Sequence, residues 1–553
     1  MKQSHRLLLA IPCLLCYAVK SEEDAVSPNQ SAFLLPPHPS LLTTPYEYTH
    51  EYLKDHFVNE HDEHHHPCTP RQIHLSLGDA QFDASKTSMT VSFSIPYRIN
   101  SFCHPDTLEI MIEYGLEGST SSKWITADSG VVRQYNTTSP STNEFYQSDY
   151  IHRVPLENLE GRTKYWYAIQ VQVQDEDDHG QSMMIQSEDA DIIAGKRQLR
   201  GNAIVDVERA IHTVRSKPVI FTTAPTSSTP QKPTKFAIVG DLGQTYNSTI
   251  TMLNMLSSTS PANKEETPVT ALLIAGDMSY ANSIQPQWDN WFNLMQPLVE
   301  AIPMMVAVGN HEIECDANTH IPFQAYENRF YMPNRLGDAM IRPVGEEYVN
   351  QLWGCATPSV FMGTYDYGNA YYSFDYGLVK TIVLSSYSDT RRTSNQYKWL
   401  LDELKNVDRH QTPWVVVMMH TQFYTTFKAH NDEVETVIMR EAMEVLFVKY
   451  RVNFVFSGHD HAYMRSKPMF QGKVDESGRS PIYMIVGEGG NREAHVKNYL
   501  HDEPEKWVAV RDKSVYGFGT LEVVNTTSAH WKWIMGGAGN GFEDDVWLKN
   551  QYL

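Results

Sequence analysis

Residues 236–241 read Phe-Ala-Ile-Val-Gly-Asp, and this step from a short apolar run into glycine and aspartate decides the fold. Four later apolar runs end in a similar way, each beside a residue with metal-binding chemistry: they cover 271–275, 304–308, 414–419 and 452–456 and lead to Asp277, Asn310, His420 and His459. Short, nearly continuous apolar strands separated by helices are typical of sheets buried on both faces. The chain from 235 to 553 is therefore predicted to be an α/β domain of layered sheets flanked by helices.

Further elements of this domain follow from the same patterns. Two more apolar runs, at 381–384 and 482–486, predict additional strands. Apolar residues at helical spacing predict helices over 288–299, 396–404 and 434–450. Strands and helices thus alternate along the domain, which favours the α/β class.

The stretch from residue 71 to 225 is rich in short strands. Clusters of Gly, Asn, Asp and Ser separate segments that include 89–95, 108–114 and 165–171. This pattern predicts a β-sandwich domain, and the polar stretch 174–200 is interpreted as a long excursion from it. Residues 226–234 are rich in Ser, Thr and Pro, and they are predicted to be the linker to the α/β domain.

Residues 1–21 are interpreted as an export signal. Lys2 and Arg6 precede an apolar run from Leu7 to Val19, and Val19-Lys20-Ser21 suits cleavage. A membrane anchor is the alternative, but the run is too short to span a bilayer. No later segment predicts a membrane span or a lipid anchor. We expect a secreted, extracellular protein, or a vacuolar or lysosomal one delivered by the secretory pathway.

Residues 22–70 form a polar extension with a dense run of histidines and acids at 56–66. A metal-scavenging tail is one interpretation of that run. A solvated, poorly ordered extension is favoured, because nothing in the sequence fixes a ligand geometry there.

Four cysteines remain after the signal, and an even number in an exported chain predicts two disulfides. Order along the chain suggests Cys68–Cys103 and Cys315–Cys355, although three connectivities are open. Cys315 or Cys355 could instead bridge two subunits, so dimer formation is also open. Export would make four sequons available for N-glycans, at Asn29, Asn136, Asn247 and Asn525.

The formal net charge of −21 argues against a general nucleic-acid binder, which needs a basic surface. A small anionic substrate is still compatible with this charge, because bound metal ions supply a positive field locally. We therefore expect no nucleic-acid partner, and with no predicted membrane span or lipid anchor we expect no membrane partner either.

The polar residues that follow the strands are expected to converge, because ligands gather at the carboxyl ends of strands in buried sheets. Alone, an Asp-x-Gly or a Gly-Asn-His is usually a turn, and His420 alone would usually be a structural histidine. Their occurrence in order, each after a strand, favours one metal site. Its candidate ligands are Asp241, Asp277, Asn310, His420, His459 and His461.

The ordered motifs Asp241-Leu242-Gly243, Gly276-Asp277-x-x-Tyr280, Gly309-Asn310-His311-Glu312, Val417-x-x-His420 and Gly458-His459-x-His461 resemble those of the purple acid phosphatases. This family belongs to the calcineurin-like metallophosphoesterases, and the likeness is nearest to its large plant-type members. It covers nearly all of the chain after residue 70 and includes 150–154, 489–493 and 516–521. It implies a four-layer α/β sandwich preceded by an all-β domain of fibronectin or immunoglobulin type.

The resemblance also implies how the ligands divide. Fe³⁺ would be held by Asp241, Asp277, Tyr280 and His461. A divalent ion, Zn²⁺, Mn²⁺ or Fe²⁺, would be held by Asp277, Asn310, His420 and His459. The phenolate of Tyr280 is a hard anionic ligand that suits Fe³⁺ and would colour the protein; its alternative role is a buried, hydrogen-bonded ring.

Two metal ions can hold a phosphate, withdraw its charge and convert a bound water into the attacking hydroxide. Fe³⁺ would keep that hydroxide available in acid. By resemblance, His311 and His430 are the catalytic candidates that protonate the leaving group or clamp the phosphate. Two positions depart from the family text: Ala429 stands where many relatives have a histidine, and Met464 stands where Glu is common.

The resulting prediction is a secreted acid phosphatase that hydrolyses phosphate monoesters, with anhydrides and phytate left open as substrates. The nearest alternative is another metallophosphoesterase, such as a phosphodiesterase or nucleotidase, which generally lacks the tyrosine three residues after the bridging Asp. The other alternative is a secreted binding protein with a dead site, and the intact ligand set argues against it.

Overall fold

A computed structural model describes residues 68–79, 85–96, 103, 108–126, 130–174, 211–226, 232–333, 335–337, 341–345, 365–536 and 543–552. The predicted signal at 1–21, nearly all of the extension at 22–70 and most of the excursion at 174–200 lie outside these residues, as do Asn29 and Cys355.

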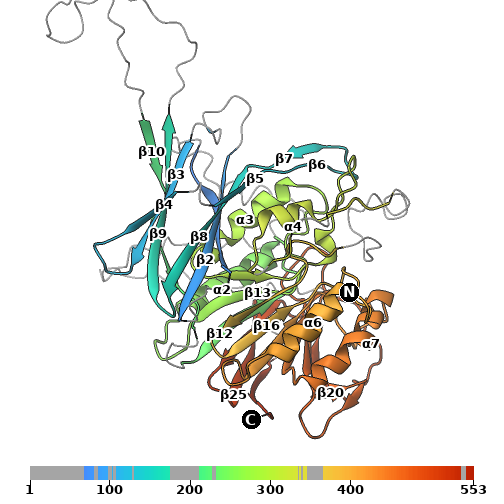
Figure 1. The fold of residues 1–553 in the computed structure, drawn as a ribbon. Helices are drawn as coiled ribbons and strands as arrows, with labels where there is room; N and C mark the ends of the chain where they lie inside the picture. Colours follow the sequence, from blue (N-terminus) through green and yellow to red (C-terminus); the bar gives the residue numbers. More distant parts are fainter. Residues whose placement is uncertain are drawn as a thin grey trace, which may run out of the picture. The chain divides into compact units, whose positions relative to one another are not determined.

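Two sheets form the core of the α/β domain (Figure 1). The first has six strands, in the order β14 (Met304–Val306), β13 (Val269–Ile274), β12 (Thr234–Val239), β24 (Gly517–Val523), β25 (Ser528–Met535) and β26 (Asp545–Lys549). Its first three strands are parallel, and the last three are added antiparallel. The parallel strands are the ones that lead to Asp241, Asp277 and Asn310.

The second sheet has seven strands, in the order β15 (Tyr372–Tyr376), β16 (Val379–Val383), β17 (Trp414–Met418), β18 (Phe454–Ser457), β22 (Ile482–Val486), β19 (Tyr463–Ser466) and β23 (Val508–Asp512). Its central strands β16, β17, β18 and β22 are parallel. The small hairpin β20 (Met469–Phe470) and β21 (Lys473–Val474) lies outside both sheets.

Alternate residues of β17 show why this strand is apolar throughout. Val415 and Val417 pack in a cluster with α6 (Asn395–Asn406) and α7 (Val434–Lys449), whereas Val416 and Met418 pack in the large central core. Neighbouring side chains of a strand point to opposite faces, so both faces of this sheet are covered. Apolar residues of α2 (Tyr246–Thr259) and α3 (Pro286–Val299) join the central core with the first sheet. The α/β fold with helices flanking the sheets is confirmed.

The N-terminal domain is an all-β sandwich, as predicted. One sheet has the order β1 (Arg71–Leu77), β2 (Lys86–Ile95), β8 (Tyr150–Glu160), β5 (Val131–Arg133). The other has β10 (Ile211–Arg215), β9 (Lys164–Gln174), β3 (Leu108–Leu116) and β4 (Lys123–Thr126), with β11 (Val219–Thr222) also on β9. A hairpin of β6 (Asn136–Thr138) and β7 (Phe145–Gln147) extends from it. Strand β1 packs against α3 of the α/β domain.

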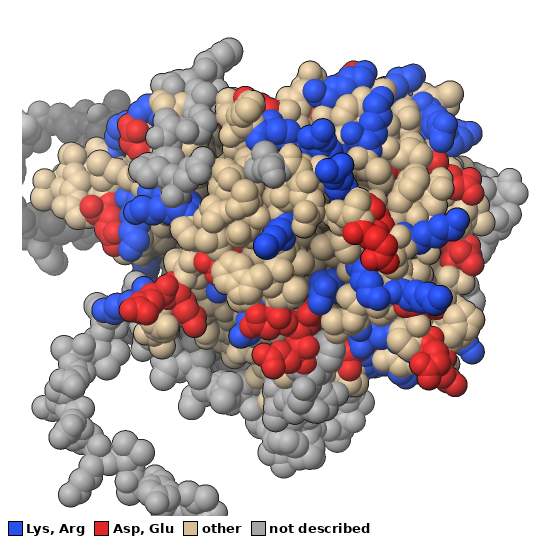
Figure 2. All heavy atoms as spheres, turned by 90° about the horizontal axis from the view of Figure 1, so that it is seen from below, with Lys and Arg blue, Asp and Glu red and all other residues tan. Residues whose placement is uncertain are grey.

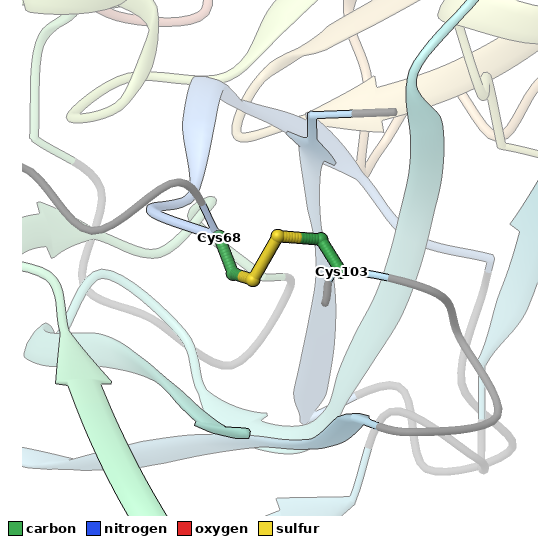
Figure 3. The surroundings of a disulfide bond; sticks show 2 residues. All are labelled: Cys68 and Cys103. Atoms are coloured by element: carbon green, nitrogen blue, oxygen red, sulfur yellow. A yellow bond between two sulfur atoms is a disulfide. The ribbon is translucent and has the colours of Figure 1, made fainter. Parts of the chain in front are cut away.

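The predicted Cys68–Cys103 disulfide is present in this domain (Figure 3). It joins the residues just before β1 to the connection between β2 and β3, with a Cα–Cα distance of 5.4 Å. Cys315 is buried, but Cys355 lies outside the described residues, so their pairing remains a prediction.

Most predicted strands and helices have the expected positions, with shifts of a few residues at their ends. Thr234, which the sequence places in the linker, is the first residue of β12. Helix α2, the short helix α4 (Gln324–Arg329) and the three C-terminal strands of the first sheet were not predicted. Helix α2 is rich in Ser and Thr and is started by a capping box of Thr245 and Ser248 rather than by an apolar stripe.

Charged side chains of both signs are interspersed on the face drawn in Figure 2. Among the described residues, no helix has the length and apolar character needed to cross a membrane. Of the three described sequon asparagines, Asn136 and Asn525 are exposed and Asn247 is half-buried in the first turn of α2.

His152 in β8 predicts a loss of stability in acid. Its ring stacks on Phe93 at 5.2 Å, and its two ring nitrogens have no hydrogen-bond partner among the described residues. Burial lowers the pKa of His152 to about 4. In the unfolded chain the pKa of this histidine is about 6.5. Between pH 6.5 and 4 the unfolded chain therefore binds a proton that the folded protein does not. The free energy of unfolding falls as pH falls through this range, by about 3 kcal/mol in total.

His152→Phe keeps the stacking. Between pH 6.5 and 4, its thermal midpoint should fall less than that of wild type. The matched control is His410→Phe, which changes an exposed histidine. The difference between its thermal midpoint and that of wild type should be the same at each pH. Parallel midpoint curves for wild type and His152→Phe would contradict the prediction.

Candidate metal centre

The ends of the central strands meet at one place. The backbone N–H of Asp241 donates to the carbonyl of Gly276 at 3.1 Å, and that of Gly458 donates to the carbonyl of His420 at 2.9 Å. The first bond joins the ends of β12 and β13, and the second joins the ends of β17 and β18. A third bond, from the Gly240 N–H to the Val486 carbonyl at 2.9 Å, joins the ends of the two sheets. All seven predicted ligands lie in this region, and six of them are buried: Asp241, Asp277, Tyr280, Asn310, His420 and His459. His461 is nearly so, with 11% of its side chain exposed.

Asp241, Tyr280 and His461 form one group of donor atoms. The Tyr280 hydroxyl lies 3.2 Å from Asp241 Oδ1 and 2.9 Å from His461 Nε2. Asp241 Oδ1 and His461 Nε2 are 3.5 Å apart. Burial, followed by the charge of Asp241, raises the pKa of Tyr280 well above its ordinary value. A phenolate at this position therefore requires a strong nearby positive charge.

Asp277, Asn310, His420 and His459 form a second group. His420 Nε2 lies 3.2 Å from Asp277 Oδ2 and 3.1 Å from Asn310 Oδ1. One ligand atom from each of Asp277, His420 and His459 lies within 4.8 Å of the others. Burial lowers the pKa of His420, but the charge of Asp277 outweighs it and raises this pKa to about 10.

Each of the three histidines uses one ring nitrogen for an orienting hydrogen bond. His420 Nδ1 bonds the Ala275 carbonyl at 2.8 Å, and His461 Nδ1 bonds the Ala494 carbonyl at 3.0 Å. His459 Nε2 lies 3.0 Å from the Glu433 carboxylate. Histidines that bind metals are typically oriented in this way, through the nitrogen that does not contact the metal. The donor set therefore fits a metal centre.

The backbone of the site is strained. Asp241, Asp277, Tyr280 and His459 all have left-handed φ values, between 52° and 69°, which non-glycine residues seldom adopt. Glycines permit the close approach, because a Cβ on Gly309 would overlap the Asp277 carboxylate and one on Gly458 would overlap that of Asp241. Such strain is common where a site fixes its ligands in advance of binding.

His311 lies beside both groups. Its ring centroid is 4.1 Å from that of Tyr280, and its Nδ1 lies 2.6 Å from Asn282 Oδ1. Its Nε2 is 3.7 Å from carboxylate oxygens of both Asp277 and Glu493. Burial lowers the pKa of His311, although these two carboxylates oppose the effect. His311 can therefore present Nε2, with or without a proton, to a substrate.

His430 is on the side of His459, with ring centroids 3.8 Å apart. Its Nδ1 lies 2.7 Å from Glu433, whose other oxygen faces His459. Burial lowers the pKa of His430, but the hydrogen bond to Glu433 and nearby carboxylates outweigh it and raise the pKa. A third of its side chain is exposed, so His430 is open to an approaching anion.

Several residues of the site were not predicted in these roles. Glu433 joins His430 to His459, and Glu493 faces His311. Glu312 accepts hydrogen bonds from the backbone N–H groups of three residues around the ligands: Asp277, Met278 and Gly309. Glu433 has a signal in the sequence, because it lies three residues after His430 and directly before α7, where the helix dipole favours a carboxylate.

Met464 and Ala429, the two positions that differ from the usual sequence of the family, have different surroundings. Met464 is fully buried in an apolar cluster with Phe427, Ala462 and Ile485, so it contributes packing there. Ala429 is half-buried and immediately precedes His430. Neither side chain replaces one of the seven candidate ligands.

Comparisons with known proteins agree with this geometry. Residues 234–463 match the family of calcineurin-like phosphoesterases. Residues 70–186 match the purple acid phosphatase N-terminal domain, and residues 480–545 match the domain described as iron/zinc purple acid phosphatase-like protein C.

Among curated relatives, purple acid phosphatase 22 of Arabidopsis thaliana is 32% identical over 481 residues, which are 87% of this chain and 85% of the relative. Phosphoenolpyruvate phosphatase of Allium cepa is 30% identical over 88% of this chain and 82% of its own length. Fe(3+)-Zn(2+) purple acid phosphatase 12 of Arabidopsis thaliana is 29% identical over 88% and 86%.

Among solved structures, a purple acid phosphatase from yellow lupin (Lupinus luteus) seeds has the same fold, with a TM-score of 0.61 at 19% identity, over 87% of this chain and 74% of that one. The relatives that are at least 30% identical span most of this chain and most of their own length, which shows a common family. The chain belongs to the purple acid phosphatase family of calcineurin-like phosphoesterases.

Proposed function

We propose that this protein is a secreted acid phosphatase that hydrolyses phosphate monoesters at a centre of Fe³⁺ and a divalent metal ion. Family membership supports the phosphatase activity. The observation that carries the metal centre is the set of three histidines, each oriented through one ring nitrogen, beside the two aspartates, the tyrosine and the asparagine.

The donor atoms suggest how the two ions are shared. Asp241, Tyr280 and His461, with Asp277, would hold Fe³⁺, since they offer hard anionic oxygens. Asn310, His420 and His459, with Asp277, would hold the divalent ion, which is Zn²⁺, Mn²⁺ or Fe²⁺. When bound, the two cations withdraw charge from a phosphate ester and make water a stronger acid.

The chain's own residues would bind the ester and move the proton. Protonated His430, held by Glu433, can clamp a phosphate oxygen. His311 is held at Nδ1 by Asn282 and presents Nε2, where a proton for the leaving oxygen would reside. Glu493, 3.7 Å away, favours the protonated ring.

The remaining expectations belong to the same proposal. Residues 1–21 would direct export, residues 71–225 and 235–553 would be the two domains, and Asn29, Asn136, Asn247 and Asn525 would carry glycans. A relative is named for its action on phosphoenolpyruvate, a phosphate monoester, which supports monoesters as the substrate class.

Tyr280→Phe tests the metal assignment. Wild type is expected to contain iron and a divalent metal and to absorb visible light through phenolate-to-iron charge transfer. The variant keeps the buried ring but lacks the phenolate, so the visible band should be lost while the fold remains. Metal analysis, an absorption spectrum and turnover of p-nitrophenyl phosphate measure this result.

The matched control is Tyr376→Phe, which removes a buried hydroxyl that donates to the Thr270 carbonyl away from the ligands. It should retain the band. A colourless, iron-free wild-type enzyme that is active would refute the iron assignment and leave the phosphoesterase assignment standing.

A further inference from the structure

The segment Tyr280–Ser283 brings two groups to the candidate site, the Tyr280 hydroxyl and the Asn282 side chain that bonds His311. Three of its four residues have a left-handed backbone conformation: φ is 54° at Tyr280, 50° at Asn282 and 66° at Ser283. Non-glycine residues in this region are less stable than in their usual conformations, so surrounding contacts must hold the segment in place.

A fully buried carboxylate supplies the first of these contacts. Glu314 Oε1 accepts a hydrogen bond of 2.7 Å from the Ser283 backbone N–H. Glu314 Oε2 accepts from Trp288 Nε1 at 2.9 Å and from Gln285 Nε2 at 3.2 Å. The position of the strained segment thus depends on what fixes Glu314 and Gln285.

Gln285 is fixed by the other domain. The hydroxyl of Tyr135, which lies between β5 and β6 of the sandwich, donates to Gln285 Oε1 at 2.8 Å. That hydroxyl also accepts from Arg329 Nε at 2.9 Å. Arg329 is buried and bonds three further residues: Gln72, Tyr146 and Asp289. The Tyr135 hydroxyl therefore closes a hydrogen-bonded chain from the sandwich domain through Gln285 and Glu314 to Ser283.

We propose that Tyr135 is a positioning residue through which the sandwich domain holds Tyr280 and the Asn282–His311 pair in place. Only the predicted loss of turnover rests on the proposed phosphatase function. The effect of Tyr135 on the backbone at Tyr280–Ser283 does not require a substrate. Removing the hydroxyl leaves the buried Gln285 Oε1 and Arg329 Nε without this partner, and buried polar groups that lose a partner rearrange to find another.

The test is Tyr135→Phe in the full chain, compared with Tyr167→Phe. Tyr167 is a matched control, because it is also a buried sandwich tyrosine and donates to the α/β domain, to the Glu300 carbonyl at 2.8 Å. Hydrogen exchange by mass spectrometry over 279–285 should be about tenfold faster in Tyr135→Phe alone. Metal-loaded Tyr135→Phe should show a shifted visible band and about tenfold lower kcat on p-nitrophenyl phosphate, with KM little changed.

The proposal would be overturned if the exchange rate over 279–285 were the same in both variants and wild type. It would also be overturned if this rate rose equally in both variants. Either result would mean that Tyr135 only stabilises the contact between the domains. Faster local exchange in Tyr135→Phe with an inactive wild-type enzyme supports the positioning role while refuting the proposed phosphatase function. Thermal midpoints, measured in parallel, show whether both variants are folded.

Discussion

Replacement of Asp277 by asparagine is expected to lower kcat/KM on p-nitrophenyl phosphate by about a thousandfold or more. Asp277 Oδ1 accepts the His311 backbone N–H at 2.9 Å, and Oδ2 lies 3.2 Å from His420 Nε2. His420 and His311 hold the pKa of the buried Asp277 well below its usual range, despite the opposing effect of burial. Asparagine keeps the shape and the acceptor for His311 but removes the negative charge that the two metal ions of the proposed centre would share.

Metal analysis of Asp277→Asn should show fewer than two metal ions per chain. Asp544→Asn is the matched control, because Asp544 is a buried carboxylate paired with Arg465 outside the site. It should retain both metal ions. Full metal content and near-normal turnover in folded Asp277→Asn would show that Asp277 is not shared between two ions.

The strands that carry the candidate ligands could be predicted because each is a local feature. A run such as Phe236–Val239 is buried on both faces, so it is apolar throughout, and the glycine and aspartate after it mark where it ends. The same reasoning placed β13, β17 and β18, and their ends do meet. Three strands of the first sheet have no such signal: β26, for example, alternates exposed and half-buried residues.

The contacts that orient the ligands could not be found in this way, although Glu433 itself lies three residues after His430. Glu433 reaches His459 from a position 26 residues earlier in the chain, and Tyr135 lies 150 residues from Gln285. Neither spacing has a local period, because the contacts exist only after two elements have packed together. Sequence patterns therefore indicate the candidate donors, and only the tertiary structure shows which groups contact them.

His311→Gln tests whether His311 supplies the proton to the leaving oxygen. Because general acid catalysis typically contributes about 10²–10⁴-fold, we expect kcat on an alkyl phosphate to fall at least about a hundredfold. An ester with a good leaving group, p-nitrophenyl phosphate, needs little protonation, so its kcat should fall much less. The ratio of the two losses, measured with the same metal-loaded preparation, is the informative quantity.

His430→Gln provides the comparison. His430 faces Glu433 and His459 and is proposed to clamp the phosphate, which both esters share. Its replacement should therefore lower the turnover of both esters by a similar factor. If His311→Gln also lowered both equally, His311 would be a second clamp rather than the acid, because a residue that only binds the phosphoryl group cannot distinguish leaving groups by their need for a proton.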